Sequence, residues 1–270
     1  MSDVIEPELK AVLRRLKLGK LMDTLPERLQ LAMQKKMTLQ EAMLVILGDE
    51  VERRESNAVA MRAAKAQLDP EMRLERWDST SPVKFDQGLW QELVAVRFIE
   101  ERRNVAIVGP VGVGKTFLAH ALGHIACRRG HTVFATSADH ALKALKHARL
   151  DHTHEAELRR LLGPDLLIID DFGLDKMDAT ESRDAYEILV ERHRAGSVII
   201  TSNRGPDEWL ATFADPMRAQ SALDRFAGNA YDLIVEGESY RTKLKPRLGS
   251  ASQQLASGSP TGPKKRRLKH

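Results

Sequence analysis

The feature that most constrains the fold of this chain is a glycine-rich loop between a short apolar run and an amphipathic stretch. The apolar run is Val105–Val108, and the stretch FLAHALGHIACRR begins at Phe117. The loop fits GxxxxGK[ST], and its residues are Gly109, Pro110, Val111, Gly112, Val113, Gly114, Lys115 and Thr116. Such a strand, loop and helix bind phosphate through backbone N–H groups and the helix N-terminus. The loop therefore predicts a parallel α/β sheet with a phosphate site.

The pattern after residue 104 supports this sheet. Short apolar runs alternate with amphipathic stretches, which is typical of parallel strands joined by helices. Apolar residues make up 42% of the chain and aromatic residues only 5%, which suits an aliphatic α/β core. We predict five parallel strands flanked by helices, at Val105–Val108, Thr132–Thr136, Leu166–Asp170, Ser197–Ser202 and Tyr231–Val235.

The rest of the chain divides by composition. Residues 1–76 read as a small all-helical domain, in which Thr38 and Glu41 form a capping box that opens a long helix. Residues 77–248 form the predicted α/β domain, and its first part, about 77–90, reads as a linker. Residues 249–270 are rich in Ser, Gly and Pro and then basic, so we expect a disordered basic tail.

Two carboxylates follow the strand at 166–170. Carboxyl ends of parallel strands share one edge of a sheet, so Asp170 can face the loop and hold Mg2+ together with the hydroxyl of Thr116. Lys115 would contact the β- and γ-phosphates, and Asp171 would act as the base that orients water. The alternative interpretation is that the two aspartates merely cap a strand.

Asn203 stands at the carboxyl end of the strand at 197–202. Its amide can hydrogen-bond the γ-phosphate or the attacking water without adding charge. The alternative is that Asn203 simply begins the turn NRGP.

Several motifs outside the loop resemble one family. Arg102-Arg103-Asn104 runs into VAIVGPVGVGKTFLAHALG, LDRFAGNA at 223–230 is followed by ESYR at 238–241, and the N-terminal segment contains EVERRE and LERWD. Over residues 9–247 the chain resembles the DnaC/IstB group of AAA+ ATPases, and most closely its IstB members, the helpers of insertion-sequence transposases.

The resemblance implies an AAA+ P-loop fold with ATP and Mg2+ as cofactors. The implied nucleotide-binding residues run from Gly109 through Phe117. The resemblance also assigns Arg225 as an arginine finger that acts on a neighbour's ATP and Arg241 as a nucleotide-binding sensor or interface residue. Arginine suits such roles because it is always charged and planar. The alternative is a surface ion pair of either arginine with Asp224 or Glu238.

The implied function is an ATP-dependent helper that oligomerises on duplex DNA, with ATP at the subunit interfaces, and recruits or activates a transposase. A DnaC-like helicase loader and an ATP-binding DNA scaffold with little turnover are the alternatives. AAA+ proteins usually have Glu where this chain has Asp171. The shorter side chain predicts hydrolysis that is slow or stimulated by DNA or a partner.

Local basic patches are the candidates for DNA contact. They consist of Lys10, Arg14, Lys17 and Lys20 near the N-terminus and of Lys143 and Lys146 in the α/β domain. Such stripes suffice for sequence-independent phosphate contact, although a solvated helix face is the alternative.

No apolar run approaches the roughly 18 residues that cross a bilayer. We therefore expect a cytoplasmic protein without a membrane partner.

Overall fold

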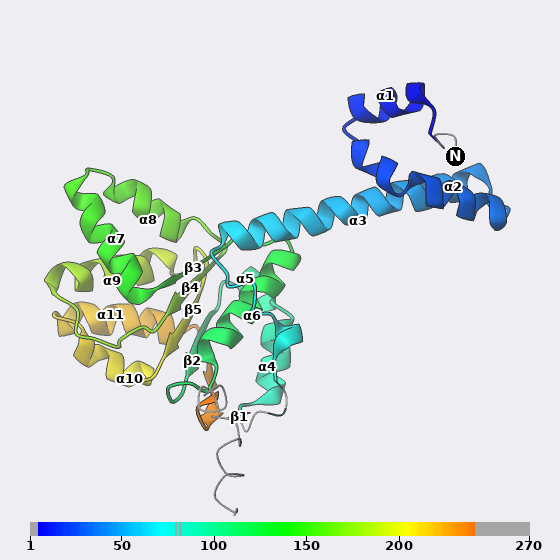
Figure 1. Cartoon of the computed structure of the whole chain (residues 1–270). Coiled ribbons are helices and arrows are strands. Elements are labelled where there is room, and N and C mark those ends of the chain that lie inside the picture. Colours follow the sequence, from blue (N-terminus) through cyan, green and yellow to red (C-terminus); the bar gives the residue numbers. More distant parts are fainter. Residues whose placement is uncertain (1–4, 79, 81–82, 241–270) are drawn as a thin grey trace, which may run out of the picture.

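The computed structural model describes residues 5–78, 80 and 83–240, and the predicted parallel sheet lies at its centre (Figure 1). Its strands follow the order β3-β4-β5-β2-β6. They are β2 (Asn104–Val108), β3 (Val133–Ser137), β4 (Leu166–Asp170), β5 (Ser197–Ser202) and β6 (Ala230–Ile234). The five-stranded prediction is confirmed, because each strand lies within about one residue of its expected bounds.

Helices cover both faces of the sheet. Successive side chains of a strand point to opposite faces, so in β4 Leu166 and Ile168 join one core cluster whereas Leu167 and Ile169 join the other. The first face is covered by α4 (Gln87–Val94), α5 (Arg97–Glu100) and α6 (Lys115–Arg128). The second is covered by α7 (Ala138–Leu150), α8 (His154–Leu162), α9 (Ala179–Arg192), α10 (Pro206–Trp209), η3 (Leu210–Thr212) and α11 (Pro216–Ala227).

The N-terminal segment is helical, as predicted. It consists of α1 (Pro7–Arg15), η1 (Gly19–Asp23), α2 (Leu25–Gln34) and the long α3 (Leu39–Lys65). The capping box at the start of α3 is present: the Thr38 N–H donates to Glu41 Oε2 over 2.7 Å, and the Glu41 N–H donates to Thr38 Oγ1 over 3.3 Å. Figure 1 shows α3 projecting from the sheet layers, with α1 and α2 at its far end.

The last turns of α3 pack against the sheet domain. Ala63 and Ala66 are buried in the first core cluster, and the Ala66 carbonyl accepts the N–H of Ala135 in β3 over 2.8 Å. The helical segment therefore reaches the edge of the sheet, and the division of the chain at residue 76 stays a prediction. In the part of the chain that the structure describes, none of the helices has the length and apolar character needed to cross a membrane.

The segment expected to be a linker is partly ordered by hydrogen bonds. After η2 (Leu74–Arg76), β1 (Val83–Lys84) pairs antiparallel with β7 (Glu236–Gly237). The Asp86 carboxylate accepts the N–H groups of Gly88 and Leu89 and so caps α4, which begins at Gln87. The expectation of a linker as far as residue 90 was wrong, because Asp86 acts as a helix N-cap.

Candidate nucleotide-binding site

The glycine-rich loop connects β2 to α6, as its sequence predicts. Gly112 and Gly114 have φ angles of 86° and 96°, a conformation that side chains rarely adopt. A Cβ on Gly112 would also lie 2.1 Å from the Ser239 hydroxyl oxygen, and one on Gly114 would lie 3.0 Å from the Trp77 ring. The loop therefore needs both glycines, and it forms a backbone cradle at the N-terminus of α6.

The Lys115 ammonium lies where the loop meets β5. It donates to the Pro110 carbonyl over 2.8 Å and to Asn203 Oδ1 over 2.6 Å, although the residue is only 5% exposed. Lys115 and Asn203 are 88 residues apart in the sequence. The structure thus brings the lysine of the loop and the amide at the end of β5 to one place, as the sequence predicted.

Asp170 lies among hydroxyl groups at the end of β4. Its Oδ1 accepts hydrogen bonds from Thr116 Oγ1, over 3.0 Å, and from the buried Thr201 Oγ1. Mg2+ prefers oxygen ligands and is commonly held by one carboxylate and a few other oxygens. The hydroxyl of Thr116 and the carboxylate of Asp170 fit that preference, so these two residues could hold the ion beside the phosphate cradle.

Asp171 differs from its neighbour in conformation and exposure. Its φ is 55°, a left-handed conformation that Asp tolerates better than most residues, and its N–H donates to Thr201 Oγ1 over 3.0 Å. The residue is exposed and lines the cavity that also contains Lys115, Thr116 and Asn203. The two adjacent carboxylates therefore face different surroundings, which allows them separate roles.

Two adjoining cavities lie beside the loop. The larger, of about 420 Å³, is lined by Lys115, Thr116, Asp171 and Asn203. The smaller, of about 90 Å³, shares Gly114, Phe117 and Tyr240 with it and adds Arg76, Trp77, Asp78 and Val113. A cavity that contains a lysine, a hydroxyl and a carboxylate, joined to a smaller one with three aromatic rings, has the chemistry that a nucleotide requires, with phosphates in one and the base in the other.

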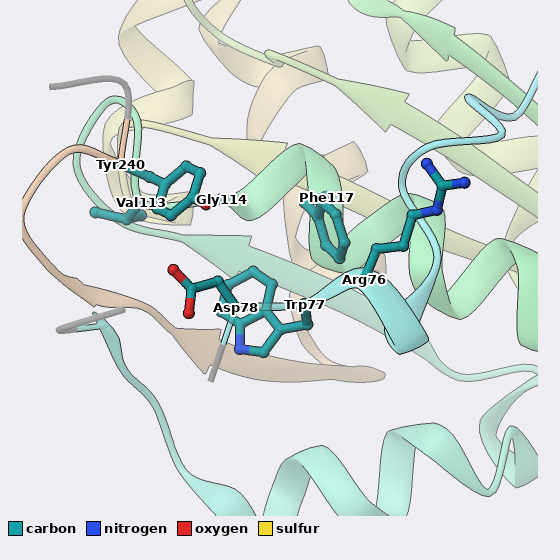
Figure 2. Close-up of a pocket in the computed structure, with 7 residues that line it drawn as sticks. All are labelled: Arg76, Trp77, Asp78, Val113, Gly114, Phe117 and Tyr240. Carbon is teal, nitrogen blue, oxygen red and sulfur yellow. The ribbon is translucent and has the colours of Figure 1, made fainter. Parts of the chain in front are cut away.

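The aromatic residues of the smaller cavity, Trp77, Phe117 and Tyr240, are shown among its lining residues in Figure 2. The rings of Trp77 and Phe117 are 5.2 Å apart between centroids, and the Tyr240 N–H donates to the Gly112 carbonyl over 2.9 Å. Trp77 and Tyr240 were not among the residues predicted for the site. An isolated tryptophan in a polar segment was the available signal, but nothing local indicated that it returns to the loop.

A comparison with known proteins identifies the family. A model described as IstB-like ATP binding protein matches residues 11–247. The chain belongs to the IstB-like family. It is 33% identical over 244 residues to an inferred ATP-binding protein in an insertion sequence of Mycobacterium tuberculosis, covering 90% of this chain and 97% of that protein. It is also 33% identical over 242 residues to the inferred ATP-binding protein of insertion sequence IS21 from Pseudomonas aeruginosa, covering 90% and 91% respectively.

Solved structures confirm the AAA+ fold of this IstB-like chain. AMPPCP-bound DnaA from Aquifex aeolicus superposes with a TM-score of 0.52 at 24% identity, covering 66% of this chain and 54% of that one. The DnaC helicase loader superposes with a TM-score of 0.51 at 20% identity, covering 59% and 95%. At these identities the likeness concerns the fold alone.

Arg225, one of the two predicted arginines of the IstB-like chain, stands apart from these cavities. Arg225 lies on α11, donates to the Ser221 carbonyl over 2.8 Å and to its hydroxyl, and lines neither cavity. It therefore does not meet the loop of its own chain. Arg241 and the predicted tail at 249–270 lie outside the described residues.

The predicted DNA contacts have mixed surroundings. Lys143 pairs with Asp139 over 2.8 Å and Lys146 with Asp178 over 2.8 Å, so their charges are partly compensated. Lys10 and Arg14 lie on α1, but Lys17 does not continue that helix, because α1 ends at Arg15 and Lys17 has a φ of 58°. Contact of these residues with DNA stays a prediction.

Proposed function

We propose that this IstB-like chain is an ATPase that assists a transposase. ATP binding at subunit interfaces drives oligomerisation on duplex DNA, the assembled form recruits or activates the transposase, and hydrolysis resets the assembly. The names of the relatives support the connection to insertion sequences and to ATP. Residues 1–76 carry the partner contact in this proposal, and the exposed apolar side chains of Val12, Leu16 and Leu44 suit that role.

The observation that carries the ATPase proposal is that the ends of two strands, β4 and β5, meet at the glycine-rich loop. Lys115 reaches Asn203 at the end of β5, and Thr116 reaches Asp170 at the end of β4. In the proposal the triphosphate lies in the larger cavity and the adenine in the smaller one. Mg2+, held by Thr116 and Asp170, would neutralise charge on the phosphates.

Hydrolysis requires a base beside the γ-phosphate. We assign this role to Asp171, which lines the larger cavity together with Asn203. An aspartate reaches less far than the glutamate usual in AAA+ proteins. We therefore propose that turnover is slow in the isolated chain and rises when the chain assembles with DNA or transposase.

Two substitutions separate an ATPase from a scaffold that binds ATP without hydrolysing it. Lys115→Ala removes a charged contact to the phosphates worth about 1.5–3 kcal/mol, so we expect nucleotide affinity to fall roughly 10- to 100-fold. Asp171→Ala should keep the affinity but reduce turnover about 10²- to 10⁴-fold. Binding is measured with a fluorescent ATP analogue, and phosphate release is measured with and without duplex DNA.

The outcomes distinguish the alternatives. Unchanged phosphate release by Asp171→Ala would favour the scaffold, and unchanged nucleotide binding by Lys115→Ala would overturn the site itself. Capture of a replicative helicase instead of the transposase by the full-length chain would favour the loader.

A further inference from the structure

Another cavity, of about 450 Å³, lies at the outer edge of β3. Among the described residues, it shares no lining residue with either cavity of the nucleotide site. The end of α3, the start of β3 and the end of α8 meet there, as Figure 1 shows. Four cations line it: Arg62, Lys65, Arg159 and Arg160. We call this cavity the basic groove.

Two of these cations, one from α3 and one from α8, are held by contacts that leave their charge. Arg62 Nε donates to the Cys127 carbonyl over 2.9 Å, which fixes the guanidinium but leaves its charge. Arg160 lies over the Phe134 ring at 4.5 Å, another contact that retains the charge. Lys65 is exposed and makes no ion pair among the described residues. The groove is therefore positively charged and partly preorganised.

Nearby acids compensate this charge only in part. Among the residues that the structure describes, those that line the groove include no carboxylate. Arg159 pairs with Glu155 over 3.4 Å on the exposed side of α8, where such a pair contributes little, and Arg160 pairs with the half-buried Glu157 over 3.3 Å. Asp165 at the turn below accepts the N–H and hydroxyl of Thr132 and adds a third negative charge near the four cations.

We infer that the basic groove binds phosphates of one strand of duplex DNA, independently of base sequence. The inference rests on the proposed function and specifies which surface of the assembled ATPase contacts the DNA phosphates. Three of the four cations are arginines, whose planar forks match phosphate oxygens. An acidic peptide would also need apolar contacts, and the apolar lining residues Val133 and Phe134 are only 7% and 6% exposed.

The cations of the basic groove come from two parts of the chain. Arg62 and Lys65 belong to α3, whereas Arg159 and Arg160 belong to the sheet domain. A phosphate backbone in the groove would therefore contact both parts of the chain at once.

The test compares full-length chains carrying paired substitutions. Lys65→Ala with Arg159→Ala removes two exposed charges of the groove, and Lys84→Ala with Arg103→Ala removes a lysine and an arginine outside it. Binding to a labelled duplex is measured by fluorescence anisotropy, with a non-hydrolysable ATP analogue, over a salt series. Each phosphate contact contributes about −0.9 to the slope of log K against log salt, so the groove variant should lose roughly 1.8 from that slope.

We expect the groove variant to bind duplex at least about tenfold more weakly and the control to bind like the wild type. Lys65→Arg with Arg159→Lys keeps both charges and should retain the wild-type slope. If the wild type binds DNA and the groove variant matches its affinity and slope, the inference is wrong and the proposed function stands. A wild type that binds no duplex would contradict both. Loss of poly-glutamate binding with unchanged DNA binding would assign the groove to an acidic protein segment instead.

Discussion

Arg192 shows how much one buried side chain can organise. It is 1% exposed, and its guanidinium donates to five carbonyls at the end of α8, the start of β4 and the start of β5. Burial lowers its pKa to about 10, so the group still carries its charge at neutral pH. The acceptors are the carbonyls of Leu161, Leu162, Pro164, Asp165 and Ser197.

Arg192→Ala should therefore be among the most destabilising substitutions in the chain. Hydrogen bonds from a charged group contribute about 1.5–3 kcal/mol each, and their loss would leave several buried carbonyls without a donor. We expect the free energy of unfolding to fall by at least about 4 kcal/mol in urea titrations followed by circular dichroism. Arg183→Ala, on the exposed side of the same helix, is the control and should change it by less than about 0.5 kcal/mol.

At the scale of elements, α6 is joined to the segment after α3 by two histidines. His120 Nδ1 accepts the Asp69 N–H over 3.0 Å, and His124 Nε2 lies 2.8 Å from the Asp69 carbonyl. The spacing of these histidines is also compatible with a metal site, but both are engaged with one backbone unit. The contact links the middle of the phosphate-binding helix α6 to the N-terminal helical segment.

The contact between His120 and Asp69 should weaken in acid. Burial lowers the pKa of His120 below its usual 6.5, so the unfolded chain takes up the proton at higher pH than the folded chain. The contribution of His120 to stability is complete above about pH 6.5 and declines as the pH falls through the window below it. His120→Asn offers a neutral acceptor that does not titrate.

We expect the free energy of unfolding of the wild type to fall between pH 7.5 and pH 5.5, and His120→Asn to lose part of this dependence. His140→Asn, at an exposed position on α7, should keep the wild-type profile. Identical profiles for wild type and His120→Asn, in urea unfolding at a series of pH values, would show that the histidine does not contribute.

At the scale of the whole molecule, the chain presents its nucleotide site and Arg225 on different surfaces. Arg225 lies with His193, Ser221 and Asp224 in an open surface hollow, away from both cavities. If Arg225 is an arginine finger, it must act on the ATP of a neighbour, through a head-to-tail interface.

Mixing two inactive variants tests this arrangement. Lys115→Ala keeps Arg225, and Arg225→Ala keeps Lys115, so each alone should lose most turnover; finger arginines contribute about 10³- to 10⁵-fold. In a randomly mixed ring about a quarter of the interfaces would pair an intact lysine with an intact arginine, so phosphate release should recover to about that fraction. No recovery in the mixture, with both variants assembling normally, would contradict action in trans.

Much of this architecture is determined locally. Runs such as Leu166–Asp170 must be buried strands, the loop before Lys115 needs its glycines, and Thr38 with Glu41 starts a helix wherever α3 lies. Each of these depends on neighbours within a few residues, and each was predicted correctly from the sequence.

The tertiary structure decided the rest, because burial patterns indicate which residues are covered and not which segments cover them. Only the fold inserts β2 between β5 and β6, places Thr201 against Asp170, and returns Trp77 to the loop. The basic groove arises in the same way, since its cations come from two helices that the sequence keeps almost a hundred residues apart. Sequence thus determined the phosphate loop and its strands, and long-range packing decided what surrounds them.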